Sequence, residues 1–293
     1  MELLKDLRGD YRRNSFAYRM LIPYLILLAL LVVYPIITNF VVSFQQDNNW
    51  SLANWRYLFA NPDFSKIGFN TLIWTVGSVT LQLLLGCFVA LLLNQEFRGR
   101  AFFRAIILVL PWATPDIVVA VAWQWMYNDM YGVINDVLFK LGLIDYYLPW
   151  LAEPTLAKIA VIVANTWKGF ALSAMFYLAA LQTVPYELHE AAVVDGAGVF
   201  RRFTSVTWPI LKPHVITTTM LTTIWTINYF PLIFTMTGGG PANATDTFVT
   251  YAYRQGFRFL EFGRSASMSS LTFGIILLIS LLYMTVLLRR EAE

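Results

Sequence analysis

Long apolar runs are the feature of this sequence that most constrains its fold. The first, residues 20–44, reads MLIPYLILLALLVVYPIITNFVVSF and carries no charged side chain. About 20 consecutive apolar residues are enough for a helix to cross the hydrocarbon core of a membrane. Lipid offers no hydrogen bonds to the backbone, so a single run of this kind has to be helical. The run is longer than the apolar part of a signal peptide and lacks a small-x-small cleavage site, so we expect it to be retained.

Five further runs predict five more spans, at residues 71–93, 105–127, 159–181, 215–236 and 269–288. The composition agrees, because 13% of the 293 residues are charged and the mean hydropathy is +0.58, whereas a soluble domain has about 25% charged residues. The sequence therefore predicts an all-α integral membrane protein, with residues 1–293 forming one domain of six transmembrane helices.

The distribution of lysine and arginine predicts the orientation of these spans. Thirteen lie in the tails and loops that share a side with both termini, and seven lie in the opposite loops. Cytoplasmic loops carry the excess of these residues, so both termini are expected in the cytoplasm. The three arginines of the loop 237–268, which this assignment places outside, run against the rule.

The loop 183–213 is a long polar segment between late spans and reads TVPYELHEAAVVDGAGVFRRFTSVTWPILKP. Pro185 suits the first turn of a helix, which we expect over 186–194, followed by a turn at Asp195-Gly196. A second short helix is expected over 197–207, ending before Pro209, because a proline disfavours helical geometry in the residue before it. Glu187 and Glu190 share one face and the alanines leave a smooth surface, as in a segment that docks into another protein. The alternative is a solvated amphipathic loop.

This segment resembles the EAA motif of permease subunits in binding-protein-dependent ABC importers. The residues that match the motif are Glu190, Ala191, Ala192, Asp195, Gly196, Ala197, Phe203, Pro209 and Pro213. TGGGPANATDT at 237–247, LPWATPDIVVAVAWQWMY at 110–127 and NTWKGF at 165–170 resemble the carbohydrate-uptake branch. Within that branch the GGGP loop is typical of the subunit that resembles MalF of the maltose importer.

The resemblance implies the type I ABC importer permease fold in a bacterial or archaeal cell membrane. It implies a heterotetrameric core with a second homologous permease and two copies of a cytoplasmic ATPase, served by an external sugar-binding protein or lipoprotein. The chain has no G-x-x-x-x-G-K-[ST] motif, so ATP and Mg²⁺ are expected on the ATPase and the permease itself is not expected to be an enzyme. The residues expected to couple it to the ATPase are Glu187, Glu190, Ala191, Ala192, Asp195, Gly196 and Ala197.

Asp116 in the third span and Lys168 in the fourth are the two charges within the predicted spans. Counting along the helices places both near mid-bilayer at similar depth, where a charge suggests a functional site. They either pair or face a hydrated cavity. The fifth span adds a polar and aromatic stripe that contains Thr218, Thr222, Trp225, Thr226 and Tyr229.

Sugars are recognised by polar groups for their hydroxyls and by aromatic rings for their apolar faces. The resemblance and the stripe together give a predicted substrate path of Trp112, Asp116, Asn165, Lys168, Gly169, Trp225, Thr226, Asn228 and Tyr229. The alternative is that the charges form a structural pair and the threonines bond only to their own backbone.

Other functions are less well supported by the sequence. A polyol or glycerol phosphate is an alternative cargo, but a phosphate favours arginine and no predicted span contains one. A membrane-embedded enzyme would need a motif such as H-E-x-x-H or G-x-S-x-G, neither of which occurs, and a channel would not need a coupling loop.

With one cysteine, two histidines and no basic stripe, we expect no metal, no cofactor and no nucleic acid. Membrane lipid is expected around the spans.

Overall fold

The structure of the protein, a computed structural model, describes residues 15–47 and 49–291. Apart from a two-residue hairpin, β1 (Gln45–Gln46) with β2 (Asn49–Trp50), the regular elements of this part are helical. Four of the basic residues on which the predicted orientation rests, Lys5, Arg8, Arg12 and Arg13, lie outside the described residues.

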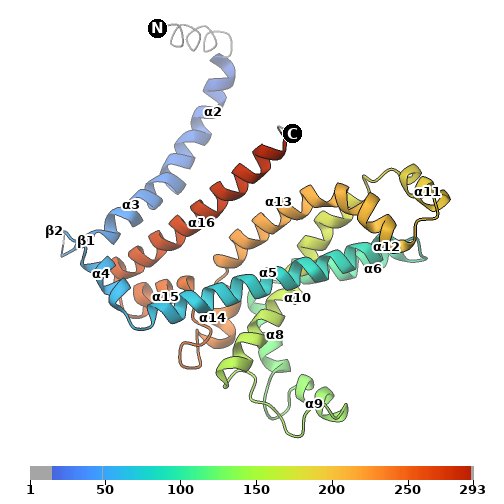
Figure 1. The fold of residues 1–293 in the computed structure, drawn as a ribbon. Helices are drawn as coiled ribbons and strands as arrows, with labels where there is room; N and C mark the ends of the chain where they lie inside the picture. Colours follow the sequence, from blue (N-terminus) through green and yellow to red (C-terminus); the bar gives the residue numbers. More distant parts are fainter. Residues whose placement is uncertain (1–14, 48, 292–293) are drawn as a thin grey trace.

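The first helical rod consists of α2 (Ser15–Leu28), a π-helical turn η1 (Ala29–Val33) and α3 (Tyr34–Ser43). Figure 1 shows that it stands away from most of the other helices, and its most apolar window has no buried residue. Apart from Arg19 near its start, this rod carries no charge, and an apolar helix that is so largely exposed is stable only where lipid or a second apolar protein surface covers it. One contact near its end, Asn39 Nδ2 to Ser270 Oγ at 3.1 Å, joins it to the last helix.

The remaining elements follow the predicted runs. They are α4 (Ala53–Ala60), α5 (Phe64–Asn94), α6 (Arg100–Arg104), η2 (Ala105–Val109), α7 (Leu110–Ala113), α8 (Asp116–Met126), α9 (Val133–Lys140), α10 (Pro154–Leu181), α11 (Tyr186–Val194), α12 (Val199–Arg202), η3 (Phe203–Thr207), α13 (Trp208–Ile227), α14 (Pro231–Thr237), α15 (Phe248–Tyr253), η4 (Arg254–Arg258) and α16 (Phe262–Glu291).

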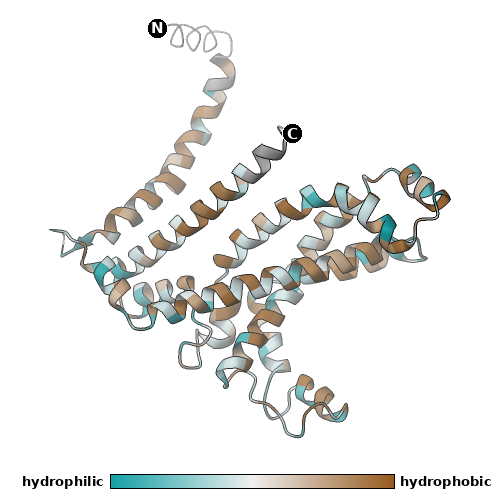
Figure 2. Ribbon diagram, viewed as in Figure 1, coloured by the Kyte–Doolittle hydropathy of each residue, from teal (hydrophilic) through white to brown (hydrophobic). Residues whose placement is uncertain are grey.

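Four helices are long and apolar enough to cross a membrane, over 19–43, 64–94, 154–181 and 262–285 of the described residues. They cover all or most of the first, second, fourth and sixth predicted runs. Figure 2 shows apolar residues along these helices, while hydrophilic residues gather around α4 and around α11 and α12.

The helix within the predicted span 105–127 is broken. Helices α7 and α8 meet at an angle of 98°, because Pro115 cannot donate a backbone hydrogen bond and keeps the preceding residue out of the helical region. Thr114 accordingly has an extended conformation, with φ −68° and ψ 128°. The bent pair together can form one broken span.

The helix within the predicted span 215–236 is interrupted as well. Helix α13 ends at Ile227 and α14 begins at Pro231, so residues 228–230 interrupt the run. Pro231 is the first residue of the second helix, and a proline cannot continue the first one.

The segment with the EAA motif is partly as predicted. Helix α11 has the expected bounds and Gly196 has the left-handed φ of +74° expected of a turn residue. The prediction that a second helix ends before Pro209 is wrong, because α12, η3 and α13 run on through it. Helix η3 ends two residues before this proline, and its wider π turn accommodates a residue without an N–H.

The core of the bundle is the pair α5 and α10, which contact each other more extensively than any other two described elements. Gly86 allows the close approach, since a Cβ there would lie 2.6 Å from the Cβ of Ser173. Tyr177, 1% exposed, packs into the cluster beside this crossing. The pair forms the wall on which the candidate site is built.

Candidate functional site

A cavity of about 420 Å³, its open mouth included, lies between α5, α7, α10 and the end of α13. Seven of the nine residues of the predicted substrate path line it. The full lining is Gln82, Trp112, Asn165, Lys168, Gly169, Leu172, Thr222, Trp225, Thr226 and Tyr229. Residues from four separate segments therefore meet at one place, although whether a substrate passes here stays a prediction.

Asp116 and Lys168 form an ion pair at the edge of the cavity. The Nζ atom of Lys168 lies 3.0 Å from Asp116 Oδ1 and donates a hydrogen bond of 2.7 Å to the carbonyl oxygen of Thr114. The break between α7 and α8 leaves this carbonyl outside both helices, so it is available to the ammonium group. Of the two arrangements that the sequence left open, the structure has the pair.

Tyr229 completes this group by donating its hydroxyl to Asp116 Oδ1 at 2.6 Å. Asp116, whose side chain is 34% exposed, does not itself line the cavity. Asn228 does not line it either, because its exposed side chain turns back to the carbonyl of Ile224 at 3.3 Å. Asp116 and Asn228 are thus the two predicted path residues that the cavity leaves out.

Buried polar groups form another part of the lining. Among the described residues, Asn165 Nδ2 and Thr222 Oγ1 are buried without a hydrogen-bond partner. Buried polar groups are almost always paired, so such atoms are candidates for contacts with water or a ligand. Both residues line the cavity, so a small rotation of either side chain would present its buried polar atom to a hydroxyl group that enters it.

Gln82, Leu172 and Thr222 line the cavity but were not among the predicted path residues. Gln82 is buried on α5 and donates to the carbonyl of Asn165 at 3.2 Å. A polar amide within an otherwise apolar span was the signal that could have found it. Gly169 makes room for this side chain, because a Cβ on Gly169 would lie 2.3 Å from Gln82 Cδ.

The aromatic part of the lining is the pair Trp112 and Trp225. Their rings stack with centroids 6.0 Å apart and an interplanar angle of 27°. The side chains remain 44% and 49% exposed, so apolar ring surface is open at the cavity. Such surface can stack on the apolar face of a sugar ring.

One threonine of the stripe hydrogen-bonds to the backbone of its own helix, which is the alternative that the sequence left open. Thr218 donates to the carbonyl of His214 at 2.7 Å, within its own helix. Thr222 makes no such bond, and the backbone of Thr226 accepts from Trp74 Nε1 at 2.8 Å. The stripe therefore divides into structural and cavity-facing positions.

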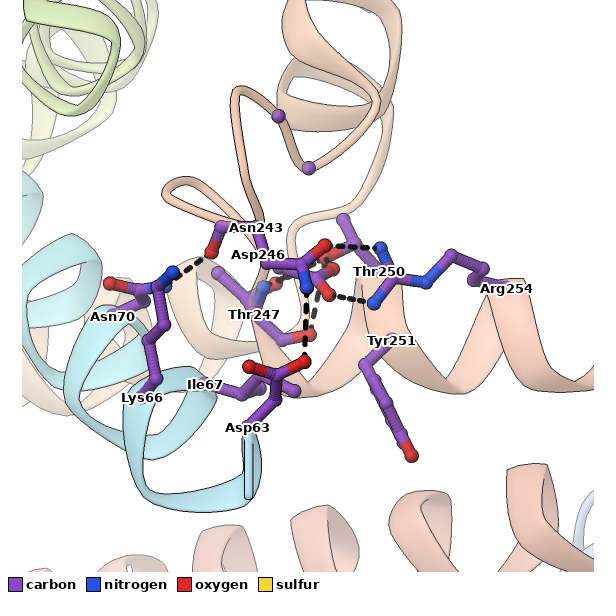
Figure 3. Close-up of polar contacts among 12 residues, drawn as sticks. Asp63, Lys66, Ile67, Asn70, Asn243, Asp246, Thr247, Thr250, Tyr251 and Arg254 are labelled. Atoms are coloured by element: carbon purple, nitrogen blue, oxygen red, sulfur yellow. Dashed lines mark hydrogen bonds and ion pairs between the residues drawn. The ribbon is translucent and has the colours of Figure 1, made fainter. Parts of the chain in front are cut away.

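The loop with the sequence GGGP is fixed by a second polar network (Figure 3). Asp246, 1% exposed, forms an ion pair with Arg254 and accepts a hydrogen bond of 2.6 Å from Thr250. Asn243 accepts from Arg254 at 2.9 Å and donates to Asp63 at 3.1 Å. Burial raises the pKa of Asp246, and the hydrogen bond from Thr250 and the charge of Arg254 oppose that rise.

The same loop is attached to the first turns of α5. Lys66 Nζ donates to the carbonyl of Ala242 at 2.6 Å, and Asn70 Nδ2 donates to that of Asn243 at 2.9 Å. Gly238 and Gly239 have left-handed φ values of +60° and +91°, which glycine adopts without strain. The loop is therefore held between α5 and α15 by side chains from both.

The predicted coupling residues lie on α11 and the turn after it, far from α9 at the lower end of Figure 1. The side chains of Glu187 and Glu190 are exposed. Val194 and Phe200 nearby are 86% and 80% exposed, an apolar surface on a polar segment of the kind that marks protein interfaces. The structure describes this surface without a partner, so the coupling role stays a prediction.

Comparison with known proteins identifies the family. Residues 82–290 match the family described as the binding-protein-dependent transport system inner membrane component. The chain belongs to this family. It is 34% identical to the trehalose/maltose transport system permease protein MalF of Thermococcus litoralis, over 94% of this chain and 95% of that protein. It is 33% identical to the diacetylchitobiose uptake system permease protein DasB of Streptomyces coelicolor, over 97% and 92%.

The fold of this permease is also found in a solved structure. A chain of a bacterial ABC transporter involved in the import of the acidic polysaccharide alginate superposes with a TM-score of 0.82 at 23% identity, over 97% of this chain and 99% of that one. The predicted family and the importer permease fold are thus confirmed. Family and apolar helices together make the chain a multi-pass membrane protein, while the count of six spans and the side of the termini stay predictions.

Proposed function

We propose that this permease is the transmembrane subunit of an ATP-driven importer for a di- or oligosaccharide delivered by an external binding protein. The cavity is the observation that carries the proposal. It combines open tryptophan surface with buried polar atoms of Asn165 and Thr222 that have no partner among the described residues. This is the pairing that a sugar, with hydroxyls on its edge and an apolar face, requires.

The relatives support a sugar as cargo. The similar permeases of Thermococcus litoralis and Streptomyces coelicolor are named for trehalose/maltose and diacetylchitobiose. A polyol or a glycerol phosphate is the second candidate. The described residues that line the cavity include no arginine, which a phosphate group would favour, so a sugar fits better.

The proposed complex pairs this chain with a second homologous permease and two copies of a cytoplasmic ATPase, in a bacterial or archaeal cell membrane with both termini inside. Helix α11 and the turn at Gly196 are the coupling segment that docks on the ATPase. Exposure of Glu187, Glu190 and the apolar residues around them supports this role.

Reconstitution tests the function. In proteoliposomes with all partners, sugar-loaded binding protein should stimulate both ATP hydrolysis and sugar uptake, whereas the purified permease alone should do neither. Hydrolysis of ATP by the single subunit would overturn the assignment. Uptake by the subunit alone would point instead to a channel or a different class of transporter.

Thiol labelling tests the orientation. Val199→Cys on α12 and Val137→Cys on α9 place thiols at exposed positions, 75% and 48% in the present side chains. In a Cys87→Ser background, a membrane-impermeant maleimide applied to intact cells should label position 137 and reach position 199 only after permeabilisation. The reverse pattern would contradict the orientation.

A further inference from the structure

Lys168 is the charged side chain among the described residues that line the cavity. Its side chain is 13% exposed. An ammonium group in such a place, left alone, would attract a carboxylate strongly, because charges interact more strongly where water is largely excluded. Whether a neighbouring group compensates the charge of Lys168 therefore affects which sugars can bind.

Asp116 compensates that charge. Its Oδ1 atom lies 3.0 Å from Lys168 Nζ, and its position is set by the Tyr229 hydroxyl at 2.6 Å and by the break before α8. The ammonium has three donors, and Asp116 and the Thr114 carbonyl occupy two of them. One donor remains for a neutral hydroxyl, while the net charge of the pair is zero.

An acidic sugar is expected to bind weakly in this cavity. Its carboxylate would lose its bound water on entering the cavity and would find no unpaired cation there. Burial of an uncompensated charge is costly. The carboxylate of Asp116, 3.0 Å from Lys168 Nζ, would also repel it. A neutral sugar avoids both costs and can use Asn165 Nδ2, Thr222 Oγ1 and the remaining donor of Lys168.

We propose that this cavity selects uncharged saccharides over acidic ones, and that Asp116 determines the selection by neutralising Lys168. This rests on the proposed function, because it assumes that sugars bind in the cavity. Asp116 acts as a positioning and charge-compensating residue and does not line the cavity itself. The fold alone does not impose neutral cargo, since the similar alginate transporter imports an acidic polysaccharide.

The test measures sugar binding to the assembled complex without its binding protein, so that the binding protein's own selectivity does not enter. Equilibrium dialysis compares maltotriose with trigalacturonate, which has the same size and carries carboxylates. The wild type should bind maltotriose at least about tenfold more tightly. Asp116→Asn keeps the acceptor for Tyr229 but frees the charge of Lys168, and should raise affinity for trigalacturonate about tenfold or more, since hydrogen bonds to charged groups are worth about 1.5–3 kcal/mol.

Two further variants make the result specific. Asp116→Asn combined with Lys168→Met should lose the gain for trigalacturonate, because the cation is gone. Asp136→Asn removes the acid of an exposed pair with Lys140 on α9 and should leave both affinities unchanged. If Asp116→Asn does not assemble, Asp116→Ser replaces it, with the same expected direction.

The outcomes separate the two proposals. If Asp116→Asn assembles, still binds maltotriose and gains nothing for trigalacturonate, charge selection is wrong and the sugar cavity stands. If the wild type binds neither sugar, or binds one with an affinity that Trp112→Ala does not change, the cavity is not the sugar site and the proposed function loses its main support. A wild type that binds trigalacturonate as tightly as maltotriose also overturns charge selection.

Discussion

Lys168 on α10 lies 3.0 Å from Asp116 at the start of α8, and the break that bends the chain by 98° before α8 also supplies Lys168 with the Thr114 carbonyl. The two charges within the predicted spans are thus joined to each other and to an interrupted helix. The pair can be purely structural or can also offer its remaining donor to a substrate. Mutation of both partners separates these roles.

Removing one member of the pair leaves a lone, partly buried charge, so Asp116→Asn or Lys168→Met alone should impair transport of the natural cargo. The double variant removes both charges and should restore assembly and stimulated ATP hydrolysis. We expect its half-saturation for uptake to stay raised, because the donor of Lys168 is lost. Wild-type uptake kinetics in the double variant would show that the pair is only structural.

The tryptophan surface should contribute directly to sugar affinity. Trp112→Ala removes the ring that stacks on Trp225 at 6.0 Å, and aromatic stacking is worth about 0.5–1.5 kcal/mol, or up to roughly tenfold in affinity. The sugar concentration that gives half-maximal uptake should therefore rise in Trp112→Ala, and transport kinetics measure it. Trp125→Ala, at a side chain 71% exposed on α8 and absent from the cavity lining, is the control and should leave it unchanged.

The ring of Tyr229 lines the cavity and its hydroxyl donates to Asp116. Two variants separate the contribution of the ring from that of the hydroxyl. Tyr229→Phe removes the hydrogen bond of 2.6 Å, so it should alter the relative affinity for neutral and acidic sugars while keeping the ring. Tyr229→Ala removes both and should weaken binding of a neutral sugar further. Equal affinities for the two variants would mean that the ring makes no contact with the sugar.

Gly169 should tolerate no side chain. A Cβ would lie 2.3 Å from Gln82 Cδ, and overpacking of this kind costs about 1–3 kcal/mol. Gly169→Ala should therefore lower the thermal stability of the complex or displace Gln82 and reduce transport. Gly274→Ala is the matched control, since nothing described lies within 4 Å of its Cβ, and it should be neutral or slightly stabilising because alanine favours helices.

Substitutions in the turn at Gly196 should act through backbone geometry rather than through steric clashes. Gly196 has φ +74° with nothing described within 4 Å of a Cβ, so a substitution there strains the backbone by about 1–2 kcal/mol without a clash. Gly196→Pro should leave the complex inserted but separate ATP hydrolysis from uptake, and Glu190→Ala should weaken the same coupling.

Gly198→Ala is the control for that turn. Gly198 has φ −65° and equally open surroundings, so alanine fits there without strain. A normal ratio of sugar transported to ATP hydrolysed in Gly196→Pro would contradict the docking role. A reduced ratio in Gly198→Ala would show that the whole segment, rather than the turn, is sensitive.

The network at the GGGP loop should be a major contributor to stability. Arg254→Met leaves the carboxylate of Asp246, 1% exposed, without its ion-pair partner, and breaking a buried pair costs about 3–5 kcal/mol. The melting temperature of the purified permease should fall clearly. Asp136→Asn on α9 breaks an exposed pair and should change it little; equal effects would mean that the loop network is not held by its ion pair.

The family and the membrane-spanning segments were accessible from the sequence because both are local properties. An apolar run has to be helical in lipid whatever surrounds it, and the residues of the EAA motif are adjacent in the chain. The bounds of α11 and the left-handed turn at Gly196 followed from proline and glycine, whose backbone preferences do not depend on tertiary contacts.

The breaks within the spans at Pro115 and before Pro231 were missed because hydropathy counts apolar residues and is insensitive to a lost backbone hydrogen bond. Prolines alone do not settle such breaks, since the helix continues through Pro209 with the help of η3.

Tertiary structure alone decided how the polar residues of the spans are used. The sequence left Asp116 and Lys168 as either a pair or two cavity residues, and the bend before α8 brought them to 3.0 Å. It marked Gln82 only as a polar amide within an apolar span, and the absence of a side chain at Gly169 admits that amide to the cavity. Distances between helices depend on how closely backbones pack, so residues far apart in the chain become neighbours only once the helices are placed.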